Sequence, residues 1–221
     1  MEFEMMSRSR VFKLDKLIIR AHKTVNTNYN IWVQKNNQRS RNILKMLNIT
    51  LRSIDKYEIP IIVIVRDFEM PTDSFSAYDR ISDIIFINDN LDSYGKVEKM
   101  LNDDYFAARN FKGILIHELV HKRHWDAAKN LYNNSLGKYN NVEEAKMVID
   151  ASLVNYVKNQ NCIDPSFLLN VSLDAYNGIL FSNSINELVA EVEVDEAKIL
   201  DKNLIKLIKE ILSYGYNGKS T

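Results

Sequence analysis

The sequence predicts an α+β fold with a small sheet in the N-terminal half, one long central helix and a helical C-terminal half. Three observations lead to this prediction. The 221 residues include only six Gly and three Pro, so residues that favour turns are too scarce for a fold of many strands. Two short runs, Ile61 to Val65 and Asp83 to Asn88, have the β-branched character and the flanking turn residues of strands. From Leu91 onward the pattern is helical nearly to the end.

The segment before the first predicted strand, about residues 1–57, is expected to be mostly helical. Apolar residues recur there at steps of three and four in Ile43, Leu44, Leu47 and Leu51. Residues 58–135 are then expected to hold the small sheet and the central helix.

Several helices are predicted after the sheet. The central helix spans about 106–131, and a second spans 143–157. Asp164 and Pro165 have the pattern of an N-cap followed by proline at the first helical position, and a last helical stretch covers 185–212. Residues 136–221 therefore form a helical half. Because the chain shows no repeat or linker, 1–221 is predicted to be a single domain.

The composition excludes several classes of function. Twenty-nine basic residues balance 29 acidic ones, so the chain lacks the basic excess expected of a protein that binds nucleic acid. The longest apolar runs are far shorter than the roughly 20 residues of a spanning helix, so no membrane partner is expected. Cys162 is the only cysteine, which excludes an intramolecular disulfide and favours a reducing compartment. With no export signal visible, the sequence predicts a cytoplasmic protein.

Three of the four histidines fall within eight residues, and two of them belong to the sequence His117-Glu118-Leu119-Val120-His121. On a helix, positions i and i+4 lie on one face with their Cβ atoms about 5–6 Å apart. Two imidazoles at that spacing can bind one Zn²⁺, while Glu118 lies beside them and can reach a metal-bound water. The pattern predicts a metal site with a Lewis acid and an adjacent general base. The alternative is a helix whose histidines face a polar groove.

His124 is excluded as a ligand by distance. A helix rises 1.5 Å per residue, so His117 and His124 are separated by roughly 10 Å along the axis. His124 is therefore expected to be a groove residue near the site, or a solvated one.

The third ligand must come from another segment, and Glu187 is the best candidate. Glu187 and Glu191 are four residues apart at the start of an otherwise apolar helical stretch, so both carboxylates point the same way. Buried carboxylates are costly unless they are paired or bind a metal. The alternatives are that Glu187 completes a capping box with Ser184, and that Glu191 is a solvated acid.

The two motifs, His117 to His121 and Asn186 to Glu191, together resemble the gluzincin group of zincin metallopeptidases. The resemblance implies a zincin-like fold with Glu187 as third ligand and Glu191 as the acid that holds the other ring N–H of His117. It also implies that the strand Ile84 to Asn88 is the edge strand that pairs with an extended substrate. Two features depart from the group: Glu191 stands where Asp is usual, and Glu187 follows His121 by as many as 66 positions.

The predicted function is therefore a zinc metalloendopeptidase acting on protein or peptide substrates. One Zn²⁺ is held by His117, His121 and Glu187 with water in the fourth position, and Glu118 is the general base. Tyr176, shortly before Glu187, is a weak candidate for stabilising the transition state, because in a chain with 11 tyrosines an ordinary packing aromatic is the better interpretation.

Two other classes of function remain open. One is a non-catalytic structural or assembly protein, phage-encoded or from a mobile element, that retains a zincin fold and is associated with a virion. Glu118 argues against it, because a purely structural site has no use for a base. The other is a zinc-free helical binding module in which both motifs arose by chance.

Overall fold

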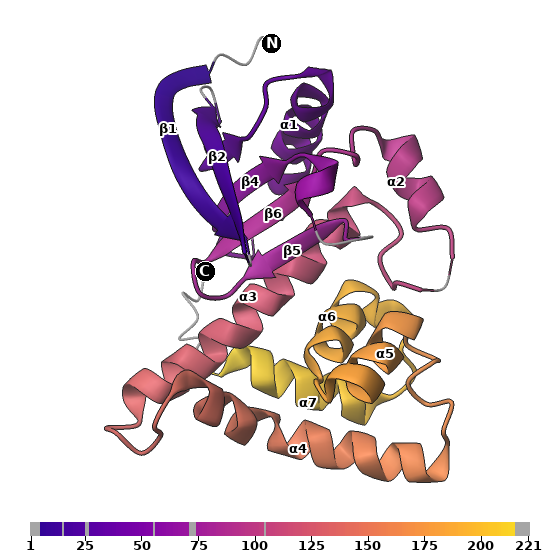
Figure 1. Cartoon of the computed structure of the whole chain (residues 1–221). Helices are drawn as coiled ribbons and strands as arrows, with labels where there is room; N and C mark the ends of the chain where they lie inside the picture. Colours follow the sequence, from indigo (N-terminus) through magenta and orange to yellow (C-terminus); the bar gives the residue numbers. More distant parts are fainter. Residues whose placement is uncertain are drawn as a thin grey trace. The chain divides into compact units, whose positions relative to one another are not determined.

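The computed structural model describes residues 5–14, 16–24, 27–54, 56–70, 74–103 and 105–214. Contacts divide the chain into two compact units. The first comprises Met1–Asn102 and Arg109–Leu119, and the second comprises Asp103–Ala108 and Val120–Thr221. The sheet belongs to the first unit, whereas the second is helical (Figure 1). The structure is thus α+β in the predicted order, and the assignment of 1–221 to a single domain stays a prediction.

The first unit is built on one six-stranded sheet. Its strands lie in the order β1-β2-β3-β4-β6-β5. β4 runs parallel to both β3 and β6, and the other neighbours are antiparallel. The strands are β1 (Met5–Leu14), β2 (Leu17–Thr24), β3 (Ile31–Val33), β4 (Ile61–Val65), β5 (Ser76–Asp79) and β6 (Ile84–Asn88).

The prediction of a mostly helical segment over 1–57 is wrong for its first part. Three strands, β1 to β3, precede the only helix that the described part of this segment contains, α1 (Gln38–Leu51). The cause is an alternation of period two in β2, where Ile19 and Ala21 are buried while Ile18 and Arg20 are exposed. The expected sheet of two strands is correspondingly too small.

The two predicted strands are confirmed as β4 and β6, but the role given to the second is wrong. β6 lies inside the sheet, bonded to β4 on one side and to β5 on the other. An interior strand has no free backbone groups with which to pair a substrate. The edge of the sheet after β6 is β5, a strand that the sequence did not predict.

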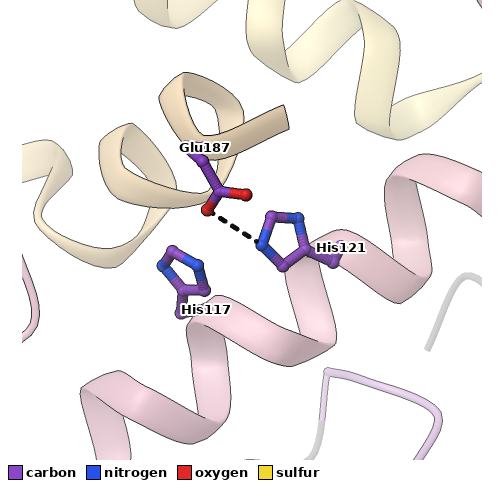
Figure 2. A group of neighbouring side chains, drawn as sticks. All are labelled: His117, His121 and Glu187. Atoms are coloured by element: carbon purple, nitrogen blue, oxygen red, sulfur yellow. Dashed lines mark ion pairs between the residues drawn. The ribbon is translucent and has the colours of Figure 1, made fainter. Parts of the chain in front are cut away.

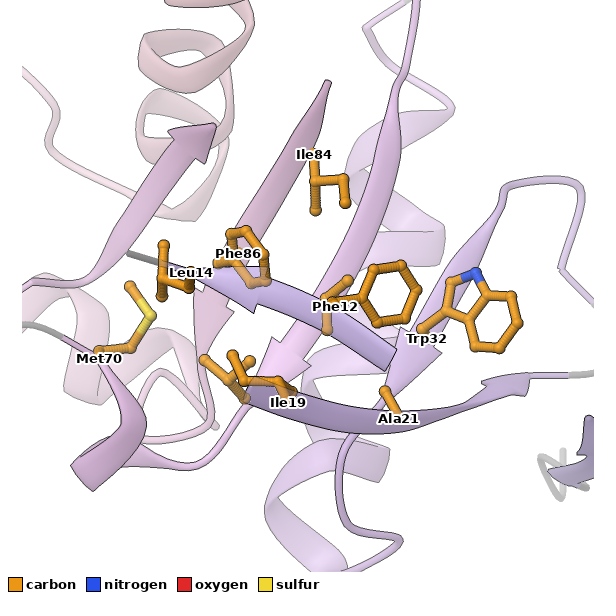
Figure 3. Close-up of a cluster of buried hydrophobic side chains, with 10 residues drawn as sticks. Phe12, Leu14, Ile19, Ala21, Trp32, Met70, Ile84 and Phe86 are labelled. Carbon is orange, nitrogen blue, oxygen red and sulfur yellow. The ribbon is translucent and has the colours of Figure 1, made fainter. Parts of the chain in front are cut away.

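A cluster of buried apolar side chains fills one face of the curled sheet (Figure 3). Phe12 and Trp32 meet edge to face at 5.3 Å between ring centroids. Because side chains alternate along a strand, Ile62, Ile64, Ile85 and Ile87 are buried on the opposite face. The cluster comprises Phe12, Leu14, Ile19, Ala21, Trp32, Val63, Val65, Met70, Ile84 and Phe86.

Side-chain caps set the starts of the helices in the first unit. Asn37 and Ser40 form a reciprocal capping box at α1, and Ser93 caps α2 (Tyr94–Met100). The long helix α3 (Phe111–Asn134) follows Asn110, whose side chain accepts a hydrogen bond from Gly113 N at 2.9 Å. The predicted central helix is thus confirmed, with its start five residues later than expected.

The second unit contains four further α-helices. The helix predicted over 143–157 is confirmed as α4 and is longer than expected. Asp164 does not begin a helix but ends α4, and Ser172 caps the next one instead. The stretch 185–212 is divided into two helices. The bounds are α4 (Val142–Ile163), α5 (Leu173–Ser182), α6 (Asn186–Val194) and α7 (Lys202–Ser213).

Of the helices in the described residues, none combines the length and the apolar character needed to cross a membrane.

Candidate metal centre

His117 and His121 lie one turn apart on α3, as their spacing predicts (Figure 2). Both side chains are half-buried. The helix is regular at this point, so it presents the two imidazoles in the same direction. Two neutral imidazoles on one helix face form a common pair of ligands for a divalent transition metal.

Glu187, in the first turn of α6, lies beside this pair (Figure 2). Its Oε2 is 3.2 Å from Nε2 of His121. One ligand atom from each of His117, His121 and Glu187 lies within 4.8 Å of the others. In a tetrahedral zinc site with ligand distances near 2.0 Å, neighbouring ligand atoms lie about 3.3 Å apart. The chemistry of this donor set and the distance from His121 to Glu187 therefore fit a zinc ion.

The alternative role of Glu187 as part of a capping box is not what the structure shows. The N-cap of α6 is Ile185, which makes no side-chain capping bond. Ser184 instead accepts a hydrogen bond from the backbone N–H of Asn186 at 3.2 Å. The carboxylate of Glu187 is thus directed to His121 rather than to the helix end.

Gly178 of α5 makes room for Glu187. A Cβ at Gly178 would lie 3.0 Å from Cγ and 3.1 Å from Cβ of Glu187. Such distances are closer than ordinary van der Waals contact, so a larger residue would push the Glu187 side chain aside. Sequence reasoning missed Gly178, although an isolated glycine within an apolar helical run is a signal of close packing.

Asp174 and Glu191 form a second candidate group with His117. One ligand atom from each of these three residues is within 4.8 Å of the others. Glu191 is fully buried and accepts a hydrogen bond from the backbone N–H of Ala107. This placement excludes the alternative of Glu191 as a solvated acid. Asp174 was missed because it belongs to a helix that the sequence did not predict at that position.

Glu118 is 5% exposed and has a partner that the sequence did not predict. The hydroxyl of Ser76, at the start of β5, donates a hydrogen bond of 2.6 Å to its Oε1. No shared motif links the two residues, since 42 positions separate them.

Tyr176 is half-buried in the middle of α5. Its backbone N–H donates to the carbonyl of Ser172, and its hydroxyl makes no hydrogen bond within the described part of the chain. Within the described residues, the Tyr176 side chain makes no hydrogen bond to His117, His121 or Glu187.

His124 is neither a groove residue nor a solvated one, so both expectations for it are wrong. It is 1% exposed, and its Nε2 lies 2.7 Å from Oδ1 of Asp150. Lys146 completes this buried cluster, with its Nζ 3.2 Å from the same ring nitrogen and bonded to the second carboxylate oxygen of Asp150. The sequence excludes His124 as a ligand because of its distance from His117 along the helix. In the structure its ring is instead buried against Asp150 and Lys146 of α4.

Burial and charge act in different directions within this cluster. Burial is the main cause that lowers the pKa of His124, and the nearby charge of Lys146 reinforces it against the hydrogen bond to Asp150. Burial by itself raises the pKa of Asp150, but the hydrogen bond with His124 and the charge of Lys146 outweigh it and lower that pKa overall. The cluster therefore combines a neutral His124 with an ion pair between Lys146 and Asp150.

The geometry of these residues is the basis on which a function can be assigned. No protein-family model, curated protein or solved structure gives a significant match to this chain.

Proposed function

We propose that this chain is a zinc-dependent metallopeptidase of zincin-like fold that hydrolyses peptide bonds in protein or peptide substrates. The observation that carries the proposal is the convergence of His117, His121 and Glu187, whose ligand atoms lie within 4.8 Å of one another. Two imidazoles and one carboxylate are the donor set of catalytic zinc sites that keep one position for water or substrate.

Each residue of the site has a distinct task in this proposal. His117, His121 and Glu187 hold the ion, and Glu191 and Asp174 orient His117 from behind. Carboxylates that accept the second ring N–H of a ligand histidine fix its tautomer and the direction of its ring. Zinc, when bound, supplies a Lewis acid that polarises a carbonyl group and lowers the pKa of water.

Glu118 moves the proton. Its carboxylate takes a proton from the attacking water as the oxygen bonds to the scissile carbonyl carbon. The same carboxylic acid then gives that proton to the leaving amine nitrogen as the C–N bond breaks. Oε1 is occupied by Ser76, so Oε2 is the oxygen that receives the proton.

An extended substrate backbone would add as a strand beside β5. This strand comes last in the order of the sheet, and peptides commonly bind by adding a strand at such a position. β5 begins at Ser76, which bonds Glu118, so a peptide on this edge lies near the base. Tyr176 keeps its proposed role in stabilising the transition state, without a contact that supports it.

Purified protein tests the proposal through its metal content and its activity on one probe, fluorescein-labelled β-casein. We expect one zinc ion per chain and cleavage of the probe. Glu118→Gln should retain the zinc and lose activity by about 10²- to 10⁴-fold, because it removes the base without removing a ligand. Glu143→Gln, on the exposed first turn of α4, is the matched control and should retain full activity.

Two results would overturn the proposal. An active Glu118→Gln protein would exclude the mechanism. A wild-type protein that binds zinc but leaves casein intact would favour the non-catalytic assembly protein instead.

A further inference from the structure

The contact between Ser76 and Glu118 joins an edge strand to the candidate base. Glu118 is 5% exposed, and a carboxylate that has lost most of its water must receive hydrogen bonds from the protein. Ser76 supplies one through its hydroxyl at 2.6 Å, a distance typical of a strong bond to a charged acceptor. Among the described residues, this is the hydrogen bond that the Glu118 carboxylate receives.

The sheet fixes the direction of Ser76. Its neighbour Ala77 packs against the apolar cluster on one face of the sheet, so Ser76 points to the other face. There it lies opposite Ile87 of β6, a fully buried residue in the register of the two strands. Both residues belong to the same compact unit as Glu118, so the hydroxyl is positioned by a strand of the sheet rather than by a loop.

We propose that Ser76 is a positioning residue for Glu118, holding the carboxylate in the rotamer from which it accepts the proton of the attacking water. The inference rests on the proposed peptidase function. A glutamate has three rotatable side-chain bonds, and a single strong hydrogen bond to one oxygen restricts all three. The hydroxyl acts through Glu118 and itself touches neither substrate nor metal.

Two substitutions of nearly equal shape test this role. Ser76→Thr keeps the hydroxyl and Ser76→Val replaces it with a methyl group, and both residues suit a strand. We expect Ser76→Val to lower kcat about tenfold, the equivalent of one lost hydrogen bond to a charged group, with KM for labelled β-casein within about twofold. Ser76→Thr should restore kcat to within about threefold of the wild type.

Ser82→Ala is the matched control. Its hydroxyl donates to the carboxylate of Asp79 in the exposed turn between β5 and β6, so it removes a similar bond from the same hairpin. We expect unchanged kcat for this variant. Zinc content should be the same in all three variants, because neither Ser76 nor Ser82 is a candidate ligand. Ser76→Thr and Ser82→Ala should keep the wild-type unfolding temperature, whereas Ser76→Val should lower it, because the buried Glu118 carboxylate loses a hydrogen bond.

The outcomes separate the inference from the function beneath it. Equal kcat for the Thr and Val variants, with Glu118→Gln inactive, would overturn the role of Ser76 and leave the peptidase assignment standing. A fall in kcat that Thr does not rescue, or one matched by a rise in KM, would equally overturn it. Failure of the wild-type protein to cleave casein would instead remove the proposed function itself.

Discussion

His124 lies one turn beyond His121 on α3, and its ring is directed at Asp150 and Lys146 of α4. Asp150 accepts one hydrogen bond from the ring of His124 and one from the charged amine of Lys146. A buried ion pair need not add stability relative to an apolar replacement, but removing one partner leaves the other charge buried and unpaired.

We therefore expect Asp150→Asn to destabilise the protein by about 3–5 kcal/mol at pH 7, measured by urea unfolding. Glu196→Gln is the matched control, because Glu196 pairs with Lys209 at 2.6 Å in the same compact unit, but both of these side chains are exposed. Its effect should stay below about 1 kcal/mol. A similarly small loss of unfolding free energy in both variants would show that the stability of the protein does not depend on the charge of the buried Asp150 carboxylate.

The lowered pKa of His124 predicts a dependence of stability on pH. The folded protein holds this ring neutral, whereas the unfolded chain protonates it near its ordinary value of 6.5. Below that pH the unfolded state binds the additional proton, so stability falls as the pH falls. We expect the free energy of unfolding to fall more steeply for the wild type than for His124→Asn as the pH decreases from 6.5 to 5.5. The difference in slope should be up to about 1.4 kcal/mol per pH unit, measured in the presence of a metal chelator. Parallel pH profiles of unfolding free energy would contradict this.

At the scale of elements, the packing of α5 on α6 determines where Glu187 lies. Gly178→Ala would place a methyl group at 3.0 Å from the Glu187 side chain and displace it from His121. We expect about tenfold weaker zinc binding, measured by competition with a chelating dye. Gly95→Ala on α2 is the matched control, since a Cβ there meets nothing within 4 Å, and it should bind zinc normally. An unchanged affinity for zinc in Gly178→Ala would show that the Glu187 side chain can shift away from the added methyl group and still bind the metal.

Elements with a strong local signal were predictable, and those fixed by tertiary pairing were not. β4 and β6 were found because β-branched runs suit strands wherever they lie. The prediction of a helical segment over 1–57 rests on the period around Ile43, whereas the alternating side chains of β1 and β2 lie before it. Asp164 and Pro165 match a helix start in type, yet α4 continues to Ile163 and uses Asp164 as its end.

The same division holds for the site. The spacing of residues on one helix predicts His117, Glu118 and His121 as candidate site residues. Glu187 is predicted because it is an acid at the start of an otherwise apolar helical stretch. Ser76 and Asp174 could not be predicted, because each reaches the site only through the packing of a separate element. No local pattern in the sequence records such a contact.

At the scale of the whole molecule, zinc should stabilise the folded state by mass action. The candidate ligands lie on α3 and α6, so an ion held by all three would bind the folded chain and not the unfolded one. At free zinc one hundredfold above Kd, the gain is about 2.7 kcal/mol. Differential scanning calorimetry should show a higher unfolding temperature with zinc than with EDTA. Glu187→Gln should abolish most of that difference, and a shift of equal size in this variant would exclude Glu187 as a ligand.

The two tryptophans give the chain an optical reporter in each compact unit. Trp32 packs on Phe12 in the sheet, and Trp125 lies on α3 with Nζ of Lys146 at 5.3 Å from the centre of its ring. Trp32→Phe and Trp125→Phe therefore each leave one fluorophore, and intrinsic emission then follows one unit at a time. If residues 1–221 form a single cooperative domain, the two fluorescence transitions in urea coincide, and separate midpoints would reveal two domains.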